Sequence, residues 1–144
     1  MRRKEGFSLV ELLIVLAVMA ALIATITPVA LNAIRKAKAT QVGQNMKTLA
    51  SAFENYVYVE GTTPSNLSDL GRDIDSTSYV VYYTVSSGTY TVVIATDETV
   101  DETALQNVVA DITTSADTST LTPLDGSSLD SAEEFFYEFS FTAY

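Results

Sequence analysis

The feature that most constrains this chain is one long apolar stretch near its N-terminus. Between Glu11 and Arg35 the sequence has 23 uncharged and mostly apolar residues. As an α-helix with a rise of about 1.5 Å per residue, such a segment spans roughly 34 Å, which is enough to cross a bilayer core of about 30 Å. The sequence therefore predicts one membrane-spanning helix that begins beside a glutamate.

Glu11 is costly at this position and needs a partner. A carboxylate at the centre of a membrane helix costs on the order of 2.5 to 3.5 kcal/mol on insertion scales, and less near the interface. One explanation is local: Ser8 and Glu11 have the spacing of a capping box, in which each side chain accepts a hydrogen bond from the other residue's backbone N–H. The other explanation is a positive charge supplied from elsewhere, and the spacing alone leaves both open.

The first residues, MRRKEGFSLVELLI, resemble the class III signal of type IV pilins and type II secretion pseudopilins. A short basic leader ends at Gly6, and Phe7, a hydroxyl residue, the isolated Glu11 and a long apolar run follow at the offsets that this family uses. Pro28 also lies where many members carry a helix-kinking proline. The resemblance covers residues 1–50 strongly and the remainder only in outline.

The resemblance implies that a prepilin peptidase cuts after Gly6 and methylates the new N-terminal Phe7. It also implies that the carboxylate of Glu11 pairs with the N-terminal amine of a neighbouring subunit. Pro28 should kink or locally melt the helix instead of ending it, because proline removes one backbone hydrogen bond and clashes with the preceding turn. Many pilins of Gram-negative bacteria close their C-terminal region with a disulfide, which this cysteine-free chain cannot form.

The charges around the apolar stretch do not fix its orientation. Three basic residues precede it and three follow it closely: Arg2, Arg3 and Lys4, then Arg35, Lys36 and Lys38. The positive-inside count is therefore nearly tied, and the resemblance, instead of the charge rule, places the C-terminal part outside. A secretory signal cleaved at a small-residue site is the competing interpretation, but the apolar run is too long for it.

Charge is segregated along the chain. Seven of the eight Lys and Arg residues lie at or before Lys47, whereas 16 of the 18 Asp and Glu residues lie after it. An acidic C-terminal part disfavours binding of nucleic acid. The sequence has no His and no Cys, which removes the commonest general base and every thiolate metal site.

The remaining sequence predicts an α+β fold, in which the long helix packs on a small antiparallel β-sheet head. Apolar residues at steps of three and four continue the helix to about Val59 as an amphipathic segment: Val42, Met46, Leu49, Phe53 and Tyr56 or Val57. The run EGTTP at residues 60–64 should end it. One helical turn is then expected within residues 64–71, with Leu67 and Leu70 facing inward.

Two runs rich in β-branched and aromatic residues, 78–85 and 89–96, predict a hairpin. Apolar residues at helical spacing predict a short helix within 97–110, with Asp97 as its cap. Residues 113–128 are rich in Ser, Thr, Asp and Gly and predict a loop. The alternation in 137–142 predicts a strand that buries Tyr137, Phe139 and Phe141.

No catalytic constellation is evident, and neither an enzymatic activity nor a cofactor is expected. Four carboxylates are weak candidates for a Ca²⁺ site: Asp97, Glu98, Asp101 and Glu102. We interpret them instead as the acidic first turn of a solvated helix. The eight Tyr and six Phe residues are interpreted as core packing and not as a path for electrons.

The expected organisation is a cleaved leader (1–6), a transmembrane or filament-core helix (7–34), its amphipathic continuation (35–59) and a head (60–144). The expected function is a structural subunit of a type IV pilus or pseudopilus, a homo-oligomeric helical filament. It would occupy the cytoplasmic membrane as a single-pass prepilin, and afterwards an extracellular or periplasmic filament built by the assembly machinery. The alternatives are a minor pilin or secretion pseudopilin, a tethered binding domain that does not polymerise, and an extracellular enzyme.

Overall fold

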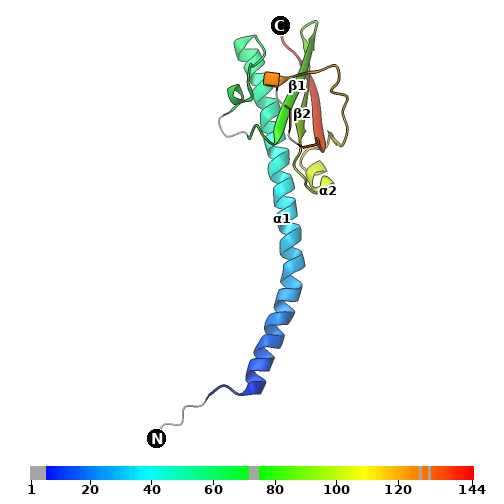
Figure 1. Ribbon diagram of the computed structural model, residues 1–144. Helices are drawn as coiled ribbons and strands as arrows, with labels where there is room; N and C mark the ends of the chain where they lie inside the picture. The colour runs from blue at the N-terminus through cyan, green and yellow to red at the C-terminus, as the bar shows by residue number, and fades with distance from the viewer. Residues whose placement is uncertain (1–5, 72–74, 127, 130) are drawn as a thin grey trace. The chain divides into compact units, whose positions relative to one another are not determined.

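The computed structural model describes residues 6–71, 75–126, 128–129 and 131–144. Within them the fold is α+β, as predicted, with one long helix and a five-stranded antiparallel sheet (Figure 1). The elements follow one another as α1 (Leu9–Glu60), η1 (Leu67–Asp69), β1 (Tyr79–Ser86), β2 (Thr89–Thr96), α2 (Glu102–Gln106), β3 (Ile112–Thr113), β4 (Thr122–Pro123), η2 (Leu124–Gly126) and β5 (Phe135–Thr142).

The chain divides into two compact units, Met1–Arg35 and Lys36–Tyr144. In the first unit, α1 begins at Leu9 and every described side chain is exposed. Helix α1 continues through Pro28, and the expected kink there stays a prediction. Residues 1–5 of the expected leader lie outside the described residues.

In the second unit, the C-terminal half of α1 buries one apolar face, which is the face that its sequence period indicates. The buried residues are Ala39, Val42, Gly43, Met46, Leu49, Ala50, Phe53 and Val57. The helix ends at Glu60 because Gly61 adopts a φ of 69°, a left-handed conformation that glycine enters without strain. Its N–H then donates to the Val57 carbonyl at 2.9 Å. Leu67 and Leu70 of the next turn are both buried, as expected.

The sheet is built around the predicted hairpin. Strands β1 and β2 pair from Tyr79↔Thr96 to Ser86↔Thr89, which leaves Ser87 and Gly88 as a two-residue loop. Both loop residues have positive φ, 52° and 82°, as a type I′ hairpin turn requires. The strand order is β3-β5-β2-β1-β4, so the last strand of the chain inserts beside β2 in the interior of the sheet.

One face of the sheet packs on α1 and forms the main core of the second unit (Figure 1). Phe53 of α1 lies at its centre, with ring centroids 5.8 Å from Tyr83, 6.4 Å from Tyr90 and 6.3 Å from Phe141. Tyr90 and Phe141, which are cross-strand partners, stack at 5.1 Å. The core therefore joins α1 to three strands through aromatic contacts.

The other face of the sheet carries a smaller cluster of Val80, Val93, Ala95 and Phe136. The segment between β3 and β5 covers it with partly buried Ala116, Leu121 and Leu129. The Tyr82 hydroxyl donates a hydrogen bond to the Glu133 carboxylate beside this cluster. Burial, followed by the hydrogen bond and the charge of Glu133, raises the pKa of Tyr82 to about 12.

The expected short helix within residues 97–110 is present as α2, but its expected cap and the expected loop after it were wrong. Helix α2 has only five residues. Its N-cap is Asp101 and not Asp97, and Asp101 Oδ1 accepts a hydrogen bond from the Ala104 N–H at 2.7 Å. The residues before it stay non-helical because the Thr96 hydroxyl accepts the Glu98 N–H and thereby ties this segment to the end of β2. The expected loop contains β3, β4 and η2, whose short pairings depend on partners far along the chain.

The C-terminal strand has the expected apolar face but a different distribution of burial. Phe135 and Phe136 are buried, whereas Tyr137, Phe139 and Phe141 are half-buried and pack against the main core. The strand begins two residues earlier than its alternation suggested, and its first two residues are buried on opposite faces because loops cover both sides there.

Gly43 marks a close approach between α1 and the segment that follows α2. A Cβ atom at this position would lie 2.8 Å from Cγ1 of Val108 and 3.2 Å from Cδ1 of Leu105. Replacing glycine by alanine in a helix normally stabilises by about 1 kcal/mol, but overpacking costs about 1 to 3 kcal/mol. We expect Gly43→Ala to lower the free energy of unfolding of a fragment covering residues 36–144 by about 1 kcal/mol, measured by urea denaturation. In a Val108→Ala background the loss should be smaller, because Cγ1 is removed and the remaining Cβ of residue 108 lies 3.0 Å away. Stabilisation in both backgrounds would show that the approach is not tight.

The distribution of burial along β5 gives a second prediction for the same fragment. Phe135→Ala should cost about 3 to 5 kcal/mol, as a buried phenylalanine does, and Phe139→Ala roughly half of that because it is half-buried. The exposed neighbour Ser140 is the matched control, and Ser140→Ala should change stability by less than about 0.5 kcal/mol. Equal losses for the two phenylalanines would contradict the burial described above.

Candidate functional site

The N-terminus of α1 holds the residues that the sequence singles out for processing and assembly. Gly6 and Phe7 precede the helix in non-helical conformation, and both are exposed. Ser8 and Glu11 form the capping box: the Glu11 N–H donates to Ser8 Oγ at 3.2 Å, and the Ser8 N–H donates to Glu11 Oε2 at 3.1 Å. The local explanation for Glu11 is therefore present in the isolated chain.

The cap does not use the whole carboxylate. Oε2 accepts the Ser8 N–H, and Oε1 accepts no hydrogen bond from the described residues. A carboxylate can accept hydrogen bonds from several donors. The arrangement leaves one oxygen of Glu11 available for a further donor.

The helix that follows presents an apolar surface on every side. Large apolar side chains between Phe7 and Ile34 are exposed by 49% to 85%. By length and composition α1 can cross a membrane, and none of its most apolar window is buried within the chain. Such a surface is unfavourable in water and needs lipid or other apolar helices around it.

The four candidate metal ligands do not converge on one point. Asp101 caps α2, Glu102 accepts from the Gln106 side chain at 3.0 Å, and Glu98 pairs with Lys38 at 2.9 Å. Among the described residues, no group of three or more acidic side chains is placed to hold a metal ion. Asp97 lies in the non-helical segment before α2.

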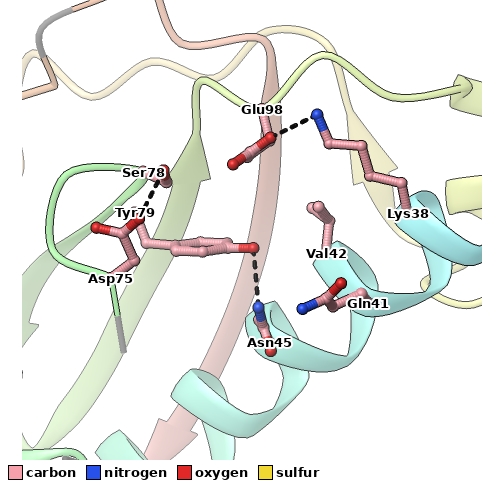
Figure 2. Close-up of a pocket in the computed structure, with 8 residues that line it drawn as sticks. All are labelled: Lys38, Gln41, Val42, Asn45, Asp75, Ser78, Tyr79 and Glu98. Atoms are coloured by element: carbon pink, nitrogen blue, oxygen red, sulfur yellow. Dashed lines mark hydrogen bonds and ion pairs between the residues drawn. The ribbon is translucent and has the colours of Figure 1, made fainter. Parts of the chain in front are cut away.

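A polar cleft of about 230 Å³ lies between α1 and the sheet in the second unit (Figure 2). From α1 it is lined by Lys38, Gln41, Val42 and Asn45, and from the sheet side by Asp75, Ser78, Tyr79 and Glu98. The ring of Tyr79 points toward α1, and its hydroxyl accepts a hydrogen bond from Asn45 Nδ2 at 3.1 Å. Burial raises the pKa of Tyr79, so the phenol stays protonated.

The polar groups of this cleft mostly satisfy one another. Lys38 and Glu98 form an ion pair, and Asp75 accepts hydrogen bonds from Thr77 and Ser78 of its own turn. These turn hydrogen bonds, led by that from the Thr77 side chain, lower the pKa of Asp75. The arrangement has no nucleophile beside a base, and we interpret it as a clamp between α1 and the sheet.

The sequence offered no signal for this clamp. Lys38 and Glu98, like Asn45 and Tyr79, are far apart along the chain and belong to no motif. Only the packing of α1 on the sheet brings them together, so the site that the sequence could identify is the N-terminal one.

Comparison with known proteins supports the same N-terminal site. Residues 1–27 match the family model described as the prokaryotic N-terminal methylation motif, which is typical of type IV pilins and pseudopilins. No curated protein and no solved structure matches the chain. The motif includes Gly6, Phe7 and Glu11, and together with the fold it indicates a structural protein that its apolar helix anchors in a membrane before assembly. The N-terminal segment of this chain is therefore similar to that of a type IV pilin-like precursor.

Proposed function

We propose that this protein is a structural subunit of a type IV pilus or pseudopilus. It is inserted in the membrane as a prepilin, is cleaved after Gly6 by a prepilin peptidase, and polymerises through its N-terminal helix into a helical homo-oligomer. The observation that carries the proposal is the exposed apolar surface of α1 up to Ile34. This surface begins beside Glu11, whose carboxylate has one oxygen bonded to the Ser8 N–H. Copies of the same helix can bury this surface in the core of a filament outside the membrane.

The position of Glu11 favours a filament over a simple tether. A tethered domain needs only an apolar helix, and Glu11 raises the cost of placing that helix in lipid. In a filament, the amine of a neighbour's mature N-terminus, Phe7, can approach the free oxygen of Glu11. Opposite charges attract far more strongly in an apolar core than in water. One such pair in each subunit also penalises any axial slip that leaves it unpaired.

The same motif is shared by major pilins, minor pilins and secretion pseudopilins. Mass spectrometry of fibres sheared from cells separates them, because a dominant band of this chain identifies the main subunit. The machinery that cleaves and assembles the chain, and the extracellular or periplasmic location of the fibre, belong to the same proposal.

Processing gives the first prediction of this proposal. The mature chain should begin at Phe7 with a methylated amine, because the leader and Gly6 match the signal. N-terminal sequencing and mass spectrometry of the membrane-extracted protein measure it. A bulky substitution such as Gly6→Leu should leave the leader attached, while a start at Met1 in the unsubstituted chain, or near residues 20–25, would exclude this processing.

Glu11 gives the second prediction. Glu11→Gln keeps an oxygen that can accept the Ser8 N–H but removes the charge, and Glu11→Leu removes both. We expect both variants to be inserted and cleaved normally, with the yield of sheared filaments falling at least tenfold, since each subunit loses its ion pair in the apolar core.

Ser8→Ala is the matched control for this experiment. It removes the hydroxyl that accepts the Glu11 N–H but leaves the charge, and it should retain most of the filament yield. Wild-type yield from Glu11→Gln would assign Glu11 to capping alone and remove it from the assembly mechanism.

A further inference from the structure

Lys47 is a basic side chain of the second unit that forms no ion pair with any described residue. Of the four basic residues that the structure describes, Lys38 pairs with Glu98, whereas Arg35, Lys36 and Lys47 have no carboxylate within ion-pair distance among the described residues. Lys47 stands apart from the other two because it lies twelve residues beyond Arg35, away from the end of the apolar stretch. Anchoring at a membrane surface explains Arg35 and Lys36 but not Lys47.

An acidic residue lies two turns further along the same side of α1. Glu54 follows Lys47 by seven residues, which is about 10.5 Å along the axis and within about 20° of the same direction around it. The two side chains are thus aligned but separated by two helical turns within one chain. The other acidic residue in this half of α1, Glu60, is thirteen residues away and points to a different side.

Part of this side of α1 is exposed. Lys47, Ser51 and Asn55 are exposed and border a shallow open surface, whereas the core face of the helix points to the sheet. Glu54 is half-buried, and it lies beside the exposed Tyr58. Desolvation, followed by the charge of Glu54 and a hydrogen bond to its carboxylate, raises the pKa of the Tyr58 phenol.

We infer that Lys47 of one copy pairs with Glu54 of the next copy when two parallel α1 helices are staggered by two helical turns. Helices that surround a common axis present the same side of each copy to it, so the side that carries Lys47 in one copy meets the side that carries Glu54 in its neighbour. At this offset the ammonium of Lys47 and the carboxylate of Glu54 come to the same level. Pairing of opposite charges selects the register, and like-charge contacts disfavour others.

The offset agrees with the proposed contact of Glu11. The Phe7 amine precedes Glu11 by four residues, which is about 6 Å in a helix and up to about 10 Å where Phe7 and Ser8 are extended. A copy displaced by two turns toward the head therefore brings its amine to the level of Glu11 and its Lys47 to the level of Glu54. The inference rests on the proposed function, and it adds a second ion pair outside the apolar core that specifies the same stagger.

Charge reversal in the full-length chain tests it. Lys47→Glu and Glu54→Lys should each lower the yield of sheared filaments several-fold, and the double variant should restore at least half of the wild-type yield. The matched control is Glu60→Lys, because the position seven residues before Glu60 holds Phe53, and this variant should retain wild-type yield. Cleavage after Gly6 should be normal in all of them.

The outcomes separate this inference from the proposed function. Absence of filaments from the wild-type chain would overturn both, whereas wild-type yield from the two single reversals would overturn the pairing alone. Loss in Lys47→Glu that Glu54→Lys does not repair would also overturn it, and would indicate a lipid or another partner at Lys47.

A second measurement needs no substitution. Carbodiimide treatment of wild-type filaments joins a paired ammonium and carboxylate, and we expect linked peptides that join Lys47 to Glu54 in the dimer band of a denaturing gel. Glu54→Gln should remove that peptide pair and Glu60→Gln should retain it. A dimer band in which Lys47 is joined only to other carboxylates would overturn the pairing.

Discussion

The apolar surface of α1 before Arg35 must be buried, and the rest of the structure depends on this requirement. Every described side chain of the first unit is exposed within the chain, so lipid or other copies must cover this helix. Within the residues that the structure describes, no side chain of this segment is covered. The first half of α1 is therefore specified by what it must contact outside the chain, and the second half by what it contacts within it.

The second unit shows how a small head can be held together without a disulfide. Its α1 face, the hairpin and the C-terminal strand share one aromatic core, in which Phe53 contacts rings of three strands. Strand β5 pairs with β2 along its whole length and lies in the interior of the sheet. Removing β5 would expose β2 and the core together, so the end of the chain is tied by strand pairing and ring packing instead of a covalent bond.

Glu11 is placed for a capping role that the structure contains and for the proposed contact between subunits. In the chain by itself, its carboxylate and Ser8 close the first turn of α1 through reciprocal hydrogen bonds. This cap uses one oxygen of the carboxylate. It therefore orients the group and leaves the other oxygen able to accept a hydrogen bond. A preorganised carboxylate loses less freedom on pairing with a charged amine, so the cap and the proposed contact between subunits support each other.

The sequence by itself determined the elements whose signals are local. The apolar length of α1, its continuation with period 3.6, the capping box and the β-branched hairpin each follow from neighbouring residues, as does the N-terminal motif. Tertiary structure decided the rest: the short strands β3 and β4, and the clamp of Lys38 with Glu98 and Asn45 with Tyr79. These features depend on partners tens of residues away, whose positions are fixed only when α1 packs on the sheet. Local sequence encodes which backbone hydrogen bonds a segment can form by itself, whereas the core decides which distant side chains meet.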